Sequence, residues 1–199
     1  MLIRTLRIGG LIAWSLVGAL AFAPDAGRAS TSVPRPVTVA TSAASLRIDR
    51  QAILGLWQLV RIDYSGPHGP LKDPVFGPNP SGTIIYDSSG WMSVQIVTAN
   101  RPRLGNPGTR LSSLNTPEEA QLKATALDSY YAYFGTWTYD SGKSTITHHL
   151  VASLLLPDET GLDYRREVQF DGAHLSLIVH GQSGGEARTR TLVWERLPH

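Results

Sequence analysis

Short extended segments, separated by turn-forming residues, follow one another from residue 55 to the end of the chain. They are rich in β-branched and aromatic residues and are bounded by glycine, proline, asparagine or aspartate, which is the pattern of strands joined by turns. About eight segments fit this description: residues 56–64, 83–87, 91–98, 133–139, 144–156, 163–170, 174–180 and 188–197. The pattern predicts an all-β fold.

The connections between these segments select a topology. Most are short, so strands that are neighbours in sequence pair antiparallel. About eight strands allow such a sheet to close around one small ligand, and closure removes the exposed edges that promote aggregation. We therefore predict an antiparallel up-and-down barrel. One helix is inserted between the third and fourth strands, because Thr116-Pro117-Glu118-Glu119 combines an N-cap, an N1 proline and first-turn acids.

The inserted helix is expected to run to about Tyr131. Together with the loop at 100–115, Tyr130 and Tyr131 can form part of a lid. At the other end of the predicted barrel, a helical turn within residues 46–54 can plug the bottom, and Arg196 can stack on Trp57, because the first and last strands of a closed barrel are neighbours.

The N-terminus has the composition of a secretory signal peptide. Two arginines precede an apolar run and a region of small residues, which predicts a signal peptide at 1–29. A flexible linker rich in Ser, Thr, Ala and Pro follows at 30–50, and the barrel domain occupies 51–199. The apolar run is short for a spanning helix, so we expect no stable membrane insertion after cleavage; an uncleaved anchor is the alternative. The expected location is exported, periplasmic or extracellular.

The basic character of the chain belongs largely to this leader. The sequence has 18 basic and 16 acidic residues, and removal of 1–29 takes away three arginines and one aspartate, which leaves 15 of each. A neutral domain gives no reason to expect nucleic acid as a partner. No cysteine is present, and no metalloprotease, hydrolase or phosphate-loop motif occurs, so neither a metal nor a cofactor is predicted.

Several motifs, taken in order, resemble one known family. They are Gly55-Leu56-Trp57, Gly82-Thr83-Ile84-Ile85-Tyr86, Trp91-Met92-Ser93, Phe134-Gly135-Thr136-Trp137, Thr147-His148-His149 and Val193-Trp194-Glu195-Arg196. From about Leu54 to Leu197 the chain resembles the lipocalin-like domain family of bacteria and fungi. The resemblance implies a calycin-type small β-barrel with a cavity for an apolar or amphipathic small molecule. It implies no reaction, since one fold serves many functions.

Strand alternation predicts which residues face the cavity. In the fifth strand His148 shares its face with Ile146, Leu150, Ala152, Leu154 and Leu156, so it is expected inside and His149 outside. An inward histidine can orient a ligand or transfer a proton, and it can also be a neutral core residue bonded to a neighbouring strand.

The sixth strand places Tyr164 and Arg166 inside with Val168 and Phe170. A buried arginine needs an anion, which can be a ligand carboxylate or a protein acid such as Asp63 or Asp163. Tyr133 and Trp137 are further candidates for the cavity wall, although strand aromatics also serve as core. The predicted ligand-binding residues are therefore Arg166, Tyr164, His148, Tyr133 and Trp137.

Three functions are compatible with these features. The first is an exported protein that binds a small apolar or amphipathic molecule in the barrel. The second is a cyclase-, isomerase- or lyase-type enzyme on the same barrel, in which His148 transfers a proton and Arg166 stabilises developing negative charge. The third is a structural module of the cell envelope with a filled core. Catalytic residues other than His148 are not assigned.

Overall fold

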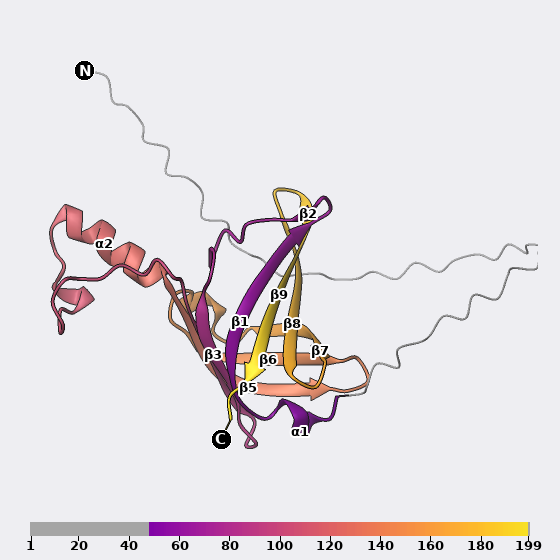
Figure 1. Cartoon of the computed structure of the whole chain (residues 1–199). Coiled ribbons are helices and arrows are strands. Elements are labelled where there is room, and N and C mark those ends of the chain that lie inside the picture. Colours follow the sequence, from indigo (N-terminus) through magenta and orange to yellow (C-terminus); the bar gives the residue numbers. More distant parts are fainter. Residues whose placement is uncertain (1–47, 199) are drawn as a thin grey trace, which may run out of the picture. The chain divides into compact units, whose positions relative to one another are not determined.

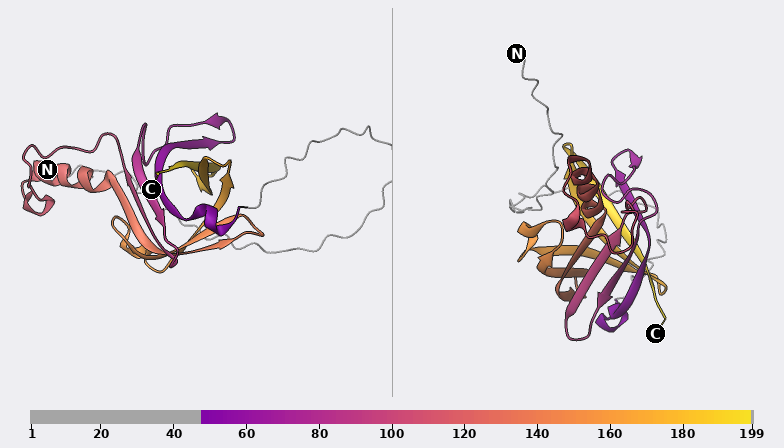
Figure 2. Two further views of the ribbon diagram at one scale, coloured as in Figure 1. Left: turned by 60° about the horizontal axis from the view of Figure 1, so that its bottom comes forward. Right: turned by 90° about the vertical axis from the view of Figure 1, so that its left-hand side faces the viewer.

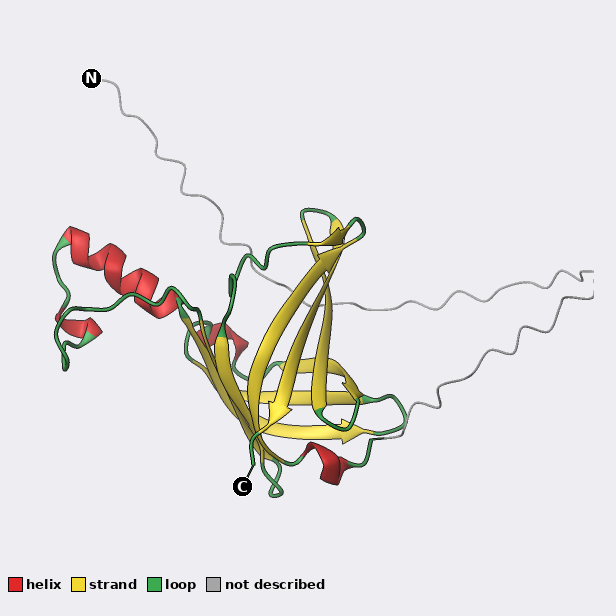
Figure 3. Ribbon diagram, viewed as in Figure 1, coloured by secondary structure: helices red, strands yellow, loops and turns green. Residues whose placement is uncertain are grey.

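The computed structural model describes residues 48–198, which form a closed antiparallel barrel (Figures 1 and 3). The strands are β1 (Gly55–Gly66), β2 (Gly69–Pro70), β3 (Ser81–Tyr86), β4 (Trp91–Val97), β5 (Tyr130–Asp140), β6 (Thr145–Ser153), β7 (Asp163–Phe170), β8 (His174–Ser183) and β9 (Glu186–Arg196). Pairing of β1 with both β3 and β9 closes the sheet. The predicted all-β, eight-stranded, up-and-down barrel is confirmed, with β2 as a two-residue addition. The predicted signal peptide at 1–29 and the predicted linker up to residue 47 lie outside the described residues.

The predicted helix is matched only in part. Helix α2 (Pro117–Asp128) begins with the capping box of Thr116 and Glu119, as the sequence indicates, and it lies after β4 because the unpredicted β2 precedes β3. It ends at Asp128, and Tyr130 and Tyr131 are the first residues of β5, not of the helix. Pairing of Tyr131 with Ile96 explains the earlier end, because a strand partner overrides helical continuation.

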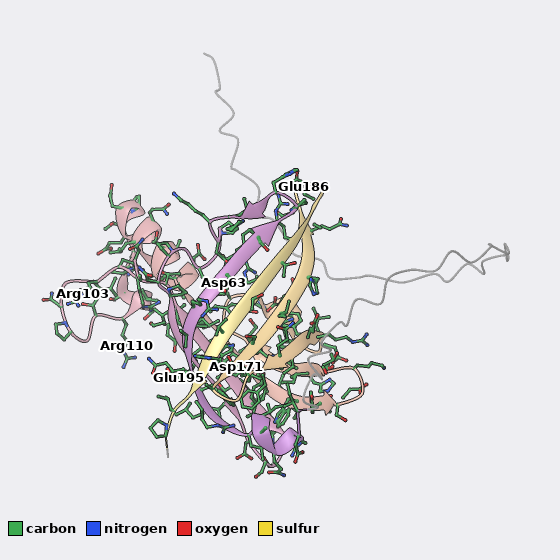
Figure 4. The ribbon with its side chains drawn as sticks, turned by 45° about the vertical axis from the view of Figure 1, so that its right-hand side comes forward. Asp63, Arg103, Arg110, Asp171, Glu186 and Glu195 are labelled. Carbon is green, nitrogen blue, oxygen red and sulfur yellow. The ribbon has the colours of Figure 1, made fainter. Side chains whose placement is uncertain are left out.

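Helix α2 belongs to an arm that also contains the short 3-10 helix η1 (Leu111–Ser113). The arm projects from the barrel wall and does not cross its opening (Figure 2). Exposed Arg103 and Arg110 lie on this arm (Figure 4). The expectation that this loop and helix contribute to a lid is therefore not met. No helix within residues 48–198 is long and apolar enough to cross a membrane.

One end of the barrel is plugged as predicted. Asp49 caps helix α1 (Arg50–Ile53), whose Ile53 is fully buried against the core. The indole N–H of Trp57 donates to the Ile53 carbonyl at 2.9 Å. The Arg196 guanidinium lies 4.2 Å from the centre of the Trp57 ring and donates to the carbonyls of Ala52 in α1 and of Leu54 after it. The predicted contact between the first and last strands is confirmed, and it ties the plug to the sheet.

Two β-bulges change which residues face the interior. In β1 the register shifts between Leu59 and Arg61, so Val60 is extruded; the sequence required a bulge in this strand because its apolar residues cannot otherwise share one face. A second bulge extrudes Val151 from β6, opposite Phe134 and Gly135. Beyond this bulge, residues of β6 that were predicted to face inward face outward, and the reverse.

The predicted inward face of β6 is therefore wrong after Leu150. Ala152 pairs with the outward Phe134, while Ser153 pairs with the inward Tyr133. Leu154 and Leu156, predicted inside, are 52% and 44% exposed. The extra residue at the bulge exchanges the faces of Ala152 and Ser153, since the side-chain period of a strand is two residues, whereas Leu154 and Leu156 follow the end of β6 at Ser153, where alternation no longer applies.

Strands β7 and β8 separate along part of their length. Residues 163–166 of β7 pair with β6, but pairing with β8 starts only at Glu167 opposite Ile178. The second half of β8 pairs with β9 alone. Figure 1 shows the two strands diverging from their paired ends. The barrel wall is therefore interrupted beside Tyr164 and Arg166.

Candidate functional site

A histidine held between two tyrosines lies at the centre of the barrel. His148 on β6 is 1% exposed. Its Nε2 lies 2.7 Å from the Tyr86 hydroxyl on β3, and its Nδ1 lies 2.8 Å from the Tyr133 hydroxyl on β5. His148 points inward as the alternation predicts. Both ring nitrogens are occupied, so a bound molecule cannot contact them directly without displacing a tyrosine.

Burial keeps this cluster uncharged. Desolvation, assisted by the positive charge of Arg166 and by His149, holds the pKa of His148 well below 6.5. Burial also raises the pKa of both the Tyr86 and Tyr133 hydroxyls, and Arg166 partly opposes this effect on each. At neutral pH the cluster is a neutral imidazole between two neutral phenols.

Arg166 on β7 brings a positive charge to this cluster. Its side chain is half-buried, its guanidinium lies 4.9 Å from the centre of the Tyr164 ring, and one N–H donates to the Arg165 carbonyl at 3.0 Å. It also lies close enough to the Tyr133 hydroxyl to hydrogen-bond with it and lower its pKa. Within residues 48–198 no carboxylate lies at ion-pair distance from Arg166.

The two acids that the sequence suggested as partners are engaged elsewhere. Asp63 pairs with Arg61 at 2.9 Å on the outer wall, where Figure 4 labels it. Asp163 accepts from His149 Nδ1 at 2.6 Å on the outside of β6 and β7. The expectation that either acid neutralises Arg166 is therefore wrong. The strand period explains this, since both residues have the outward parity.

Glu159 is a functional-site candidate that the sequence did not indicate. It ends the short 3-10 helix η2 (Pro157–Glu159), between β6 and β7. Burial raises the pKa of the Tyr164 hydroxyl, and a hydrogen bond to the Glu159 carboxylate raises it further. The Oε2 atom of Glu159 is buried and has no hydrogen-bond partner in the described part of the chain. Glu159 lies in the connection between two strands, where side chains do not alternate between faces. The sequence pattern therefore could not predict that it lies near Tyr164.

Tyr86 was also missed, although alternation offered a signal. It shares the inward parity of Ile84, and both are buried. Its ring lies 4.9 Å from that of Trp137. The Trp137 indole donates to the Asp87 carbonyl at 3.1 Å, and its ring is covered by Arg50 at 4.4 Å. Trp137, a predicted ligand contact, thus faces inward and is engaged by the plugged end.

The loop between β2 and β3 packs against the aromatic residues of the predicted site. Asp73 forms a buried ion pair with Arg190, with Oδ2 and Nε 2.6 Å apart, and also accepts from the backbone N–H of Phe76 at 3.0 Å. Phe76 in turn contacts Tyr131, whose ring lies 5.4 Å from that of Tyr133. The β2–β3 loop is therefore anchored over the same side of the interior as the predicted site.

Two shallow hollows mark the outside of the wall. One is lined by Ile85, Asp87, Trp91, Met92, Ser93 and Phe134. The other lies between the start of β1 and the β3–β4 turn. Neither contains Tyr133, His148 or Arg166, although Tyr86 lines part of the second hollow. Within residues 48–198 no three His, Asp or Glu side chains gather closely enough to hold a metal ion.

The structure brings four of the five predicted residues together. Tyr133, His148, Tyr164 and Arg166 form one cluster, while Trp137 lies beside Tyr86 toward the plug. A comparison with curated protein sequences finds no match. The family model described as a lipocalin-like domain matches residues 54–197. This range contains every strand of the barrel, from β1 to β9. A match over most of the chain, on a closed eight-stranded antiparallel barrel, shows that this protein belongs to the lipocalin-like domain family.

Proposed function

We propose that this protein is exported and holds a small apolar or amphipathic molecule inside its barrel, with Arg166 as the principal polar contact. The observation that carries the proposal is the Arg166 guanidinium: it faces a largely aromatic and aliphatic interior without a carboxylate partner in the described chain. Ligand sites of this kind are mainly apolar, with a few polar groups that orient the ligand. A half-buried guanidinium beside an interrupted wall meets this description.

Electrostatics support the same interpretation. Taking a charge out of water costs free energy that a fold normally recovers through an ion pair. Here the guanidinium recovers part of it by stacking on Tyr164 and by donating to the Arg165 carbonyl. The other N–H groups of the Arg166 guanidinium can donate to an oxygen atom of a ligand, and two of them can do so side by side.

The direct test is native mass spectrometry of the mature protein, produced with its own leader, followed by extraction of any molecule that co-purifies. Binding of Nile red, a neutral apolar dye, provides a second readout. We expect a bound molecule or dye binding, and weaker ligand binding in Arg166→Ala with the fold intact. An empty protein that binds no dye would instead support the filled structural module.

Export is tested in the same preparation. The leader at 1–29 predicts removal of the N-terminus near Ala29 or Ser30. N-terminal sequencing of the protein recovered from outside the cytoplasm should begin there. Recovery of the intact N-terminus in the membrane fraction would support the uncleaved anchor instead.

The enzyme is the second candidate, and one observation bears on it. The Arg166, Tyr133, His148 and Tyr86 side chains are linked in series, so a proton could move through the tyrosines although His148 itself is enclosed. In this mechanism Tyr133 contacts the substrate and His148 acts through it. A candidate reaction that proceeds at an unchanged rate in both Tyr133→Phe and His148→Gln would exclude it.

A further inference from the structure

Counting protons in the central cluster shows that one hydrogen-bond donor is left over. A neutral imidazole has one N–H and one bare nitrogen, and each tyrosine has one O–H. The two hydrogen bonds between His148 and the tyrosines therefore use one tyrosine O–H and the imidazole N–H. The other tyrosine accepts from the imidazole, and its own O–H proton has no protein acceptor within residues 48–198.

Arg166 indicates how the chain of hydrogen bonds is oriented. A guanidinium can only donate, so a hydrogen bond between Arg166 and Tyr133 runs from the guanidinium to the Tyr133 oxygen. The positive charge makes the Tyr133 O–H the better donor to His148 Nδ1, which leaves the Tyr86 proton unused. In the opposite tautomer the Tyr133 proton is the one left over. Either way the interior presents Arg166 N–H groups and a tyrosine O–H that lack an acceptor.

Glu159, in contrast, has an acceptor atom that lacks a donor among the described residues. Its carboxylate lies close enough to the Tyr164 hydroxyl to raise the pKa of that group, yet its Oε2 is buried without a donor in the described chain. Arg166 stacks on that same Tyr164 ring, but no ion pair joins it to Glu159. The guanidinium and the carboxylate thus both lie near one tyrosine, and the buried Oε2 atom of Glu159 lacks a hydrogen-bond partner within residues 48–198, which is costly for a buried group.

From this arrangement we infer the chemistry of the ligand's polar end: a carboxylate or carbonyl oxygen that accepts from Arg166, with a hydroxyl a few bonds away that donates to Glu159. Hydroxy acids and hydroxy ketones with an apolar remainder are the corresponding class. The acceptor also faces the tyrosine–histidine cluster, whose spare O–H can shift toward it. This inference rests on the proposed function and specifies the head group of the same site.

The test uses three probes with one apolar chain: 3-hydroxyoctanoate, octanoate and 1-octanol, each displacing Nile red from the mature protein. A hydrogen bond to a charged group contributes about 1.5–3 kcal/mol, so each lost contact should weaken binding by about tenfold or more. We expect 3-hydroxyoctanoate to bind tightest, octanoate next and 1-octanol weakest. Arg166→Gln should remove the preference for octanoate over 1-octanol, and Glu159→Met the preference for the 3-hydroxy acid over octanoate.

Arg165→Gln is the matched control, because Arg165 is the exposed neighbour of Arg166 on the same strand and should leave all three affinities unchanged. Circular dichroism establishes that each variant is folded. Nile red binding with equal displacement by all three probes would overturn the inference and leave the proposed function standing. Failure of Nile red and of every probe to bind the folded protein would overturn both.

Discussion

Replacement of His148 should change how the stability of this barrel depends on pH. In the folded protein the buried imidazole has a pKa well below 6.5, whereas in the unfolded chain it titrates near its ordinary value. Below about pH 6.5 the unfolded state therefore binds one proton more than the folded state, which favours unfolding. The wild-type protein should lose stability as the pH falls from 6.5, and His148→Gln should lack this contribution.

The size of the effect follows from linkage. One proton of difference corresponds to about 1.4 kcal/mol of unfolding free energy per pH unit, so the contribution of His148 approaches this slope as the pH falls below about 6.5 and ends where the folded imidazole is itself protonated. The contribution vanishes above pH 6.5, where the imidazole is neutral in both states. Loss of the two tyrosine contacts shifts the stability of His148→Gln at every pH, so the slope is the informative quantity.

Urea unfolding followed by tryptophan fluorescence at several pH values measures this slope. All other groups are the same in both proteins, so their effect cancels in the comparison. His68→Gln, which removes an exposed histidine, is the matched control and should retain the wild-type dependence on pH. Equal slopes for the wild type and His148→Gln between about pH 6.5 and 5 would refute the assignment of a buried, neutral His148.

Three further substitutions test the framework around the site. Gly135→Ala should destabilise the barrel on the order of 3 kcal/mol in thermal unfolding, because its Cβ would stand 2.0 Å from the His149 carbonyl oxygen; an unchanged melting temperature would contradict the bulge geometry. Asp73→Ala leaves the largely buried Arg190 without its carboxylate and should cost about 3 kcal/mol in urea unfolding, whereas a loss below about 1 kcal/mol would mean that the pair is solvated. Arg196→Lys keeps the charge but loses the flat stacking and one carbonyl contact, so a loss of about 1–2 kcal/mol is expected from the same assay, and wild-type stability would argue against the stacked geometry.

Much of the barrel could be predicted because the relevant signals are local. Alternation in β7 placed Tyr164, Arg166, Val168 and Phe170 on one face, and no bulge interrupts that strand. The capping box at Thr116 announced the start of α2 for the same reason, since it involves only residues three apart.

The contact between Arg196 and Trp57 was predictable for a different reason. It joins residues far apart in the sequence, but closure of any up-and-down barrel brings the first and last strands together. Topology, not local pattern, supplied the prediction.

The candidate site was only partly predictable. Its members face inward because of strand parity, but the partners of each group depend on register and side-chain length. The sequence offered Asp63 and Asp163 as partners of Arg166, and both point outward to other residues. Glu159 came from a turn, where no periodicity applies.

By itself the sequence determined the family, the strand order, the plugged end and the inward face of β7, because alternation, turn chemistry and helix capping act between residues close in the chain. Only the tertiary structure decided where the Val151 bulge exchanges the faces of β6, where α2 gives way to β5, and that two tyrosines enclose His148. These features depend on pairing between distant strands, in which one extra residue reverses every side chain beyond it. The same long-range packing left the charges of Arg166 and Glu159 unpaired beside Tyr164, on which the proposed ligand chemistry rests.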